Sequence, residues 1–295
     1  MKKKSLLLLV VALLTVFSLA GCSEKEEPAS GSDTDMLTTA LTNMAEAKSM
    51  TYAMDMTMTM SAEGQTLDMS TLSEIQFIMD PLTMKMNMSL SMAGVDELED
   101  TGNMTTSSYM ETVDGTAWMY MDAGDGTWYK QNLGDAAALQ QYDVTQTIDA
   151  YVSTPEQFKS VGTEEVNGSE ATKFEGVLSE DSLNDAINNS GVLSQMNLDG
   201  IDEATLQSMY EGMDDLAMTL WIDNETLLPV KYEMDMSDMM NTVMKNLMAS
   251  TDETAAAQIS VDKVFVTVEI TGYDNVSAIE IPEEARNAEE MTVTE

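Results

Sequence analysis

The chain has 295 residues, of which 52 are acidic and 13 are basic, so its formal net charge is −39 at pH 7. It contains no histidine and one cysteine, which excludes a His-based catalytic triad, a structural zinc site and an internal disulfide. A strong negative charge without a basic stripe argues against nucleic-acid binding. Hydrophobic residues make up 43% of the chain, so we expect a folded protein rather than a disordered one.

The first residues have the features of a secretory signal. Three lysines at positions 2–4 precede an apolar run at 6–19, and Ala20-Gly21 stands directly before Cys22, the single cysteine. The run is too short for a spanning helix and ends in small residues. This arrangement resembles a bacterial lipobox, which implies cleavage before Cys22 and lipidation of its thiol. An ordinary signal peptide with an incidental cysteine is the alternative.

The predicted organisation follows from this start. We expect a signal peptide at 1–21, a lipidated flexible tether at 22–35, one domain at 36–284 and a loose tail at 285–295. Acyl chains such as palmitate would hold the domain at the outer face of the bacterial cell membrane, as an extracytoplasmic monomer. Charge alone would not hold it there, because anionic headgroups repel an acidic protein.

Hydrophobic periodicity predicts a first helix and then strands. Apolar residues recur at helical spacing from Met36 to Ala45, after a possible N-cap at Asp33 or Thr34. The period changes to two at 52–60, where methionines alternate with polar residues, and the same pattern returns at 84–92.

Turn signals divide the rest of the chain into further elements. Asp114-Gly115 and Asn167-Gly168 predict tight hairpins between strands. Further strands are expected at 109–113, 116–121, 127–131, 159–166, 169–178, 216–222, 230–236 and 264–270. Helices are expected at 136–142, after a capping box at 154–157, across much of 180–213 and after Ser237. Together the elements predict an α+β fold with a strongly curved antiparallel sheet of about nine to eleven strands, a half-open β-barrel with helices packed in its concave face.

Several segments resemble the LolA/LppX-like superfamily of lipoprotein carriers and lipid-binding lipoproteins. They are the Trp-bearing meander formed by 113–118 and 126–130, the strand–turn–strand at 220–231, and the closing segment at 279–284. The resemblance is to the uncharacterised Gram-positive members of this group. It implies a half-open barrel whose apolar interior takes acyl chains.

The methionines, 29 in all, admit three interpretations. In the first, they form a packed core, because the unbranched side chain fills irregular gaps. In the second, they line a cavity for a variable apolar ligand. In the third, they bind Cu(I), for which thioethers are soft ligands. Alternate residues of one strand lie about 7 Å apart, so a copper site needs sulfurs from neighbouring strands. The predicted lining of a cavity is Tyr52, Met54, Met56, Met58, Met84, Met86, Met88, Met218, Leu220, Tyr232 and Met234.

Other residue patterns predict no chemistry. The segment 122–126 lacks the spacing of a calcium loop and favours a hairpin turn. Acidic pairs such as Asp214-Asp215 are expected by chance among 52 acids. We therefore expect a non-enzymatic protein without a cofactor, which binds or carries a lipid or other apolar molecule. A closed structural, interaction or sensor module of the cell envelope is the alternative, and Cu(I) binding is the second.

Overall fold

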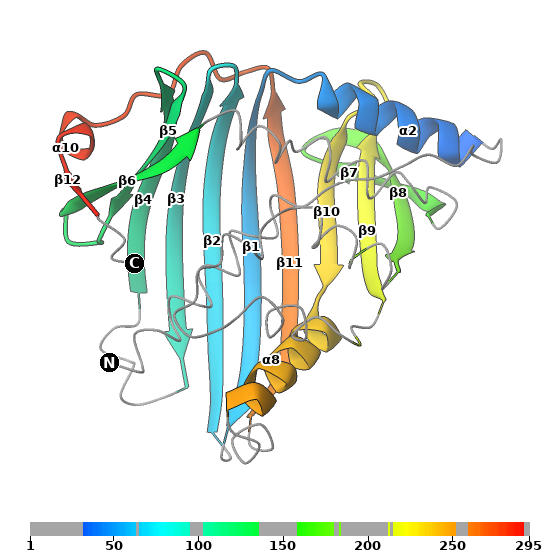
Figure 1. Cartoon of the computed structure of the whole chain (residues 1–295). Coiled ribbons are helices and arrows are strands. Elements are labelled where there is room, and N and C mark those ends of the chain that lie inside the picture. Colours follow the sequence, from blue (N-terminus) through cyan, green and yellow to red (C-terminus); the bar gives the residue numbers. More distant parts are fainter. Residues whose placement is uncertain are drawn as a thin grey trace.

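A single large sheet dominates the computed structural model, which describes residues 32–62, 65–94, 103–135, 158–179, 183, 212, 215–251 and 259–291. Twelve strands follow one another in the order β12-β6-β5-β4-β3-β2-β1-β11-β10-β9-β8-β7. The edge strands β12 and β7 do not pair, so the sheet is unclosed (Figure 1). Each neighbouring pair is antiparallel except β12 and β6, which are parallel and make the sheet mixed rather than purely antiparallel as predicted.

The N-terminal half supplies one helix and the six strands on one side of the sheet. Their bounds are α2 Ser32–Ala45, β1 Ser49–Ala62, β2 Gln65–Met79, β3 Leu82–Ala93, β4 Asn103–Val113, β5 Thr116–Asp122 and β6 Trp128–Asp135. These strands form a meander in which each one pairs with the next.

The strands of the C-terminal half complete the sheet on the other side of β1, except β12, which pairs with β6 at the opposite edge. Its elements are β7 Lys159–Val166, β8 Ser169–Leu178, β9 Leu216–Asp223, β10 Pro229–Asp235, α8 Ser237–Thr251, β11 Ile259–Tyr273, α10 Glu283–Arg286 and β12 Glu289–Glu290. The long strand β11 pairs with β1, so the two halves of the chain meet at the centre of the sheet. The helices expected at 136–142, from 154 and across 180–213 lie outside the described residues, apart from Leu183, which is helical, and Gly212, which lies in a turn.

Two predicted hairpin turns are confirmed. Asp114 and Gly115 have φ values of 51° and 79°, and Asn167 and Gly168 have φ values of 54° and 86°. Positive φ at both central positions matches the twist of the flanking strands, and Asp, Asn and Gly tolerate it best. The turn after β9 is held differently: the Asp223 carboxylate accepts hydrogen bonds from the backbone N–H groups of Glu225 and Thr226 at 3.0 and 2.7 Å.

Specific polar contacts fix the two long helices on the sheet. At the start of α2, the Asp33 carboxylate accepts hydrogen bonds from the backbone N–H and the hydroxyl of Ser160, at 3.0 and 2.9 Å. At the start of α8, the Ser237 hydroxyl accepts a hydrogen bond from the Val264 N–H at 2.9 Å. Ser237 therefore ties the start of the helix to β11.

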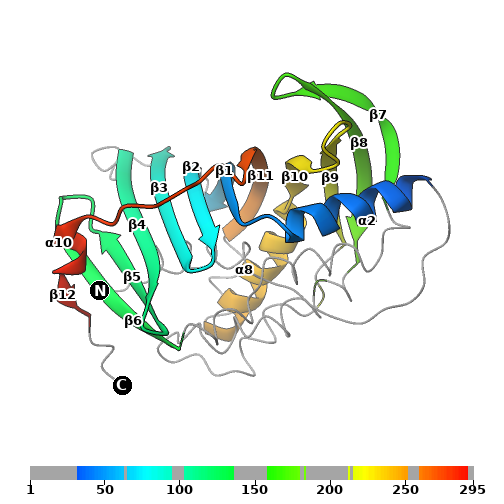
Figure 2. The same ribbon diagram turned by 90° about the horizontal axis from the view of Figure 1, so that it is seen from above.

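The sheet bends across its width, and α2 and α8 lie on the same side of it (Figure 2). Their apolar residues join one buried cluster with residues of β1, β2, β9 and β11; this cluster includes Leu37 of α2, Met239 of α8, Met56 and Val264. A second cluster surrounds Leu41 and Met44 of α2. The core therefore lies between these helices and one face of the sheet.

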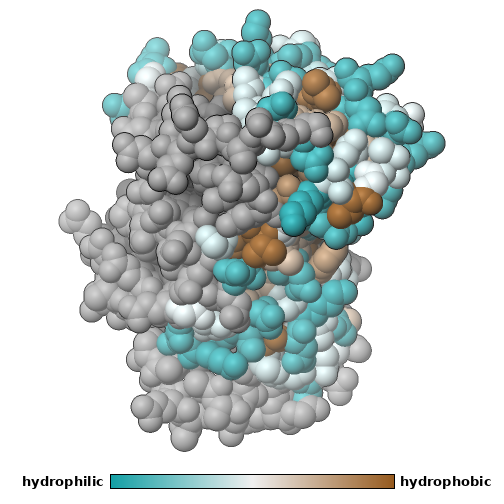
Figure 3. All heavy atoms as spheres, turned by 90° about the vertical axis from the view of Figure 1, so that its right-hand side faces the viewer, coloured by the Kyte–Doolittle hydropathy of each residue, from teal (hydrophilic) through white to brown (hydrophobic). Residues whose placement is uncertain are grey.

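The C-terminal segment crosses to the opposite face. Residues from 285 onward were expected to form a loose tail, but α10 and β12 occupy 283–290 and Met291 N–H still bonds to Lys130 O at 2.8 Å. At the other end of the sheet, β7 is exposed along nearly its whole length. The described part of the surface seen from that end is mostly hydrophilic, with small separate hydrophobic patches (Figure 3).

Candidate apolar ligand site

The register of the sheet places all eleven residues of the predicted lining on one face. Met54 of β1 lies opposite Ser73 on one side and Val268 on the other, and Ser73 lies opposite Met88. Beyond Val268 come Tyr232 and then Leu220. Residues directly opposite in an antiparallel pair point to the same side, so these residues and their i±2 neighbours share one side of the sheet, called the methionine face below.

The helices cover the β1, β9 and β11 part of the methionine face. Met56, Met58, Met218 and Leu220 are 2%, 3%, 5% and 4% exposed and belong to the same cluster as the apolar residues of α2 and α8. These four residues are packed core. The Tyr232 hydroxyl also donates a hydrogen bond to Met44 Sδ at 3.2 Å, which joins β10 to α2.

The other seven residues of the predicted lining are half-buried: Tyr52, Met54, Met84, Met86, Met88, Tyr232 and Met234. Burial raises the pKa of the Tyr52 phenol to about 12, so this group is neutral at physiological pH. The face is therefore uncharged and apolar at its partly accessible positions as well as in its core.

Five half-buried methionines lie outside both core clusters of this face. This set, called the open methionine patch below, consists of Met86 and Met88 on β3, Met110 on β4, and Met119 and Met121 on β5. The predicted lining did not include Met110, Met119 or Met121. The hairpin turn at Asp114-Gly115 could have predicted that these residues share a face, because a two-residue turn places Met110 opposite Met119.

Small polar side chains interrupt the methionines on the central strand β2. Thr71 and Ser73 are each 1% exposed and lie between the larger residues of β1 and β3. Thr71 Oγ1 is buried and has no hydrogen-bond partner among the described residues. A buried hydroxyl without a partner is unfavourable, so a hydrogen-bonding group of a bound molecule, or a water, would stabilise this position.

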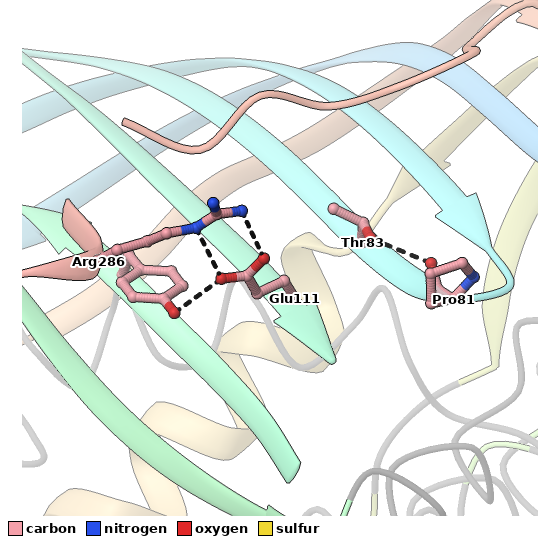
Figure 4. A network of polar contacts seen from close by, with 5 residues as sticks. Pro81, Thr83, Glu111 and Arg286 are labelled. Carbon is pink, nitrogen blue, oxygen red and sulfur yellow. Dashed lines mark hydrogen bonds and ion pairs between the residues drawn. The ribbon is translucent and has the colours of Figure 1, made fainter. Parts of the chain in front are cut away.

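The opposite face carries a polar pocket of about 400 Å³, open to solvent, lined by Glu111, Val113, Trp118, Tyr120, Lys130 and Arg286. Arg286 donates two hydrogen bonds to the Glu111 carboxylate, at 3.1 and 2.8 Å (Figure 4). The Tyr120 hydroxyl donates a third at 2.9 Å. Burial and this bond to Glu111 raise the pKa of Tyr120 to about 12. The charged groups of this pocket satisfy one another, and their main effect is to fix α10 on the sheet.

Neither a metal cluster of the usual donors nor a spanning helix is found in the described part of the chain. No group of three or more His, Cys, Asp or Glu side chains there could hold a metal ion. The helices described are also too short or too polar to cross a membrane. Cys22, the predicted lipidation site, lies outside the described residues.

Comparison with known proteins identifies the family. The model of a family of unknown function, DUF6612, matches residues 32–290. The chain belongs to the DUF6612 family. No protein of curated function matches the sequence.

Several solved structures are similar to this DUF6612 chain at low sequence identity. LprF from Mycobacterium bovis is 14% identical with a TM-score of 0.46, covering 88% of this chain and 100% of its own. Lipoprotein LppX from Mycobacterium tuberculosis is 13% identical with a TM-score of 0.43, covering 84% of this chain and 97% of its own. A putative outer membrane lipoprotein-sorting protein domain from Vibrio parahaemolyticus is 8% identical with a TM-score of 0.23, and the match covers 86% of this chain and 97% of that domain.

Proposed function

We propose that this DUF6612 protein is a non-enzymatic lipoprotein, anchored to the outer face of the bacterial cell membrane, that binds a lipid or other apolar molecule against its methionine face. The proposed lining consists of the seven half-buried residues of the predicted lining together with Met110, Met119 and Met121, whereas Met56, Met58, Met218 and Leu220 are packed core beneath the helices. In this arrangement α2 and α8 pack in the concave face of the sheet, and the ligand occupies the part of that face beside them.

The open methionine patch is the observation that carries the proposal. Its five side chains are half-buried, although one fully buried methionine contributes about 1.5–3 kcal/mol to stability. Only a minor part of each side chain is exposed, so covering all five would contribute at most about 5 kcal/mol before the cost of association. Flexible thioethers also adapt to ligands of different shapes.

The buried hydroxyl of Thr71 supports a ligand with one polar group. Thr71 lies on the methionine face. It is two residues from Ser73 along β2, and Ser73 lies directly opposite Met88 of β3. An acyl chain packed on the methionines could place a carbonyl or hydroxyl oxygen near Thr71 Oγ1 and satisfy it.

Native mass spectrometry of the gently extracted full-length protein tests the proposal. We expect a co-purifying lipid, and uptake of a fluorescent fatty acid by the emptied protein. Met88→Glu would place a charge on the methionine face and is expected to weaken uptake at least about tenfold. Ser89→Glu is the matched control, since Ser89 is the next residue of β3, is exposed and points to the opposite face.

Two outcomes would count against lipid binding. Ligand-free spectra together with no fatty-acid uptake would favour a closed structural or sensor module, in which the methionine face is packed core throughout. Equal effects of Met88→Glu and Ser89→Glu would show that uptake takes place elsewhere on the protein.

Anchoring is tested separately. Cys22→Ser removes the thiol that would carry the acyl chains, so the protein is expected in the culture medium or as an uncleaved precursor. Metabolic labelling with palmitate, present in the unmodified protein and absent from Cys22→Ser, completes the test. Labelling that persists in the variant would contradict the anchor.

A further inference from the structure

Three methionines stand side by side on neighbouring strands of the methionine face. Met84 of β3 lies directly opposite Met110 of β4, and Met110 lies directly opposite Met119 of β5. All three are half-buried. Met110 and Met119 belong to neither core cluster of this face, and Met84 only borders the second. Among the described residues, packing therefore does not enclose this row of thioethers.

We propose that Met84, Met110 and Met119 form a binding site for Cu(I). Thioether sulfur is a soft donor that selects Cu(I) over hard cations such as Mg²⁺ and Ca²⁺. The three sulfurs are uncharged and do not neutralise the bound ion, which favours a singly charged ion over a divalent one. The high negative charge of the chain raises the local concentration of cations around it.

The geometry of the sheet allows three sulfurs to reach one ion. A metal–sulfur bond of about 2.3 Å places three sulfurs around an ion roughly 4 Å apart. Side chains directly opposite on neighbouring strands have Cβ atoms about 4.5–5.5 Å apart. The outer strands β3 and β5 lie about 10 Å apart, so Met84 and Met119 must lean toward Met110 from either side. Three rotatable bonds give methionine this freedom.

A second row of directly opposite methionines shows why solvent access decides which row we assign to copper. Met58, Met69 and Met92 also lie opposite one another on β1, β2 and β3. Met58 and Met69 are only 3% and 5% exposed and are packed into the core cluster with α2 and α8. Copper entry there would require the core to open, whereas the described residues leave the Met84–Met110–Met119 row partly exposed.

Competition with bicinchoninate for Cu(I), without oxygen, tests the site in the purified full-length protein. We expect the protein to remove one equivalent of Cu(I) from the coloured chelate. Loss of groups that merely support a metal site weakens binding about 10–100-fold. The triple variant Met84→Leu, Met110→Leu and Met119→Leu, which removes the ligands themselves, should weaken it by at least about 100-fold.

The matched control replaces three methionines that have no methionine directly opposite. Met36→Leu, Met60→Leu and Met104→Leu affect residues that are also half-buried, and leucine preserves their apolar volume. Binding should be unchanged in this control. Copper X-ray absorption of the loaded protein should show sulfur as the nearest neighbour.

The copper site does not depend on the lipid proposal, and the outcomes of the copper experiments test it separately. Failure to compete with the chelator, or equal loss in the triple variant and the control, would overturn the copper site whatever the lipid result. The methyl ¹³C resonances of the methionines give a second readout in the unmodified protein. Addition of Cu(I) should shift three of them, identified through the single variants at 84, 110 and 119, and shifts confined to other methionines would overturn the assignment.

Discussion

The hydroxyl of Tyr232 on β10 donates a hydrogen bond to Met44 Sδ of α2 across 3.2 Å. The two residues are 188 positions apart in the chain. Tyr232 borders both core clusters, while Met44 lies within the second. This contact therefore links the first helix to the strand beside β11 at the place where the two clusters meet.

Removing this hydrogen bond should loosen α2 by a small, measurable amount. A typical protein hydrogen bond contributes about 0.5–1.5 kcal/mol, and sulfur is a weak acceptor, so Tyr232→Phe should lower the free energy of unfolding by about 0.5 kcal/mol. Met44→Leu breaks the same bond and preserves volume. In a double-mutant cycle followed by urea unfolding, the second substitution should add little to the first. Full additivity would show that the two groups do not interact.

Thr71→Val should stabilise the protein in the absence of ligand. The substitution replaces a buried, unpartnered hydroxyl with a methyl group of similar size, so the free energy of unfolding should rise by about 1 kcal/mol. If a ligand oxygen bonds to Thr71, the same variant should bind fatty acid more weakly. Ser89→Val, at an exposed position on the opposite face, is the control. A loss of stability in Thr71→Val would show that the hydroxyl is already satisfied.

Stability should fall in alkaline solution between about pH 10 and 12. Burial raises the pKa of Tyr52 from 10.0 to about 12, so below pH 10 both the folded and the unfolded state keep the proton. Above pH 10 the unfolded state loses it first, which favours unfolding until the folded state also titrates. This residue should contribute a decrease of at most about 3 kcal/mol.

Tyr52→Phe should remove that part of the alkaline decrease. Tyr120 also titrates near pH 12, so a decrease should remain in this variant. Tyr129→Phe, at a position 38% exposed, is the control and should leave the profile unchanged. Unfolding free energies measured in urea at several pH values give the comparison. Identical profiles for Tyr52→Phe and the unmodified protein would contradict the assignment.

Arg286→Gln should release the C-terminal segment without unfolding the sheet. The lost contact is the ion pair with Glu111, in which the Arg286 side chain is 53% exposed, so global stability should change by less than about 1 kcal/mol. Hydrogen exchange of α10 and β12 should become faster, and proteases should cut there more readily. Lys263→Gln removes a positive charge from the same face and should leave exchange in this segment unchanged. Unaltered protection in Arg286→Gln would show that apolar contacts of Ile281 and Ala285 suffice.

Much of the local structure could be read from the amino-acid sequence. Alternation of methionine with polar residues at 52–60 and 84–92 predicts strands with one apolar face, because successive side chains of a strand point to opposite sides. Asp114-Gly115 and Asn167-Gly168 predict their hairpins, since few residues tolerate positive φ at both central positions. Such local rules act over a few residues and do not depend on the rest of the chain.

Only the tertiary structure decided which methionines are core and which remain accessible. Met58 and Met88 have the same alternating pattern in the sequence, yet Met58 is covered by the helix-bearing core and Met88 is half-buried. The difference arises because α8 packs against β11, and β11 pairs with β1 from the other end of the chain. The pairing of β12 with β6 could not be predicted from the sequence either, because the two acidic residues of β12 have no strand pattern. They pair with β6 because Arg286 and the apolar residues before it hold α10 on the sheet beside them.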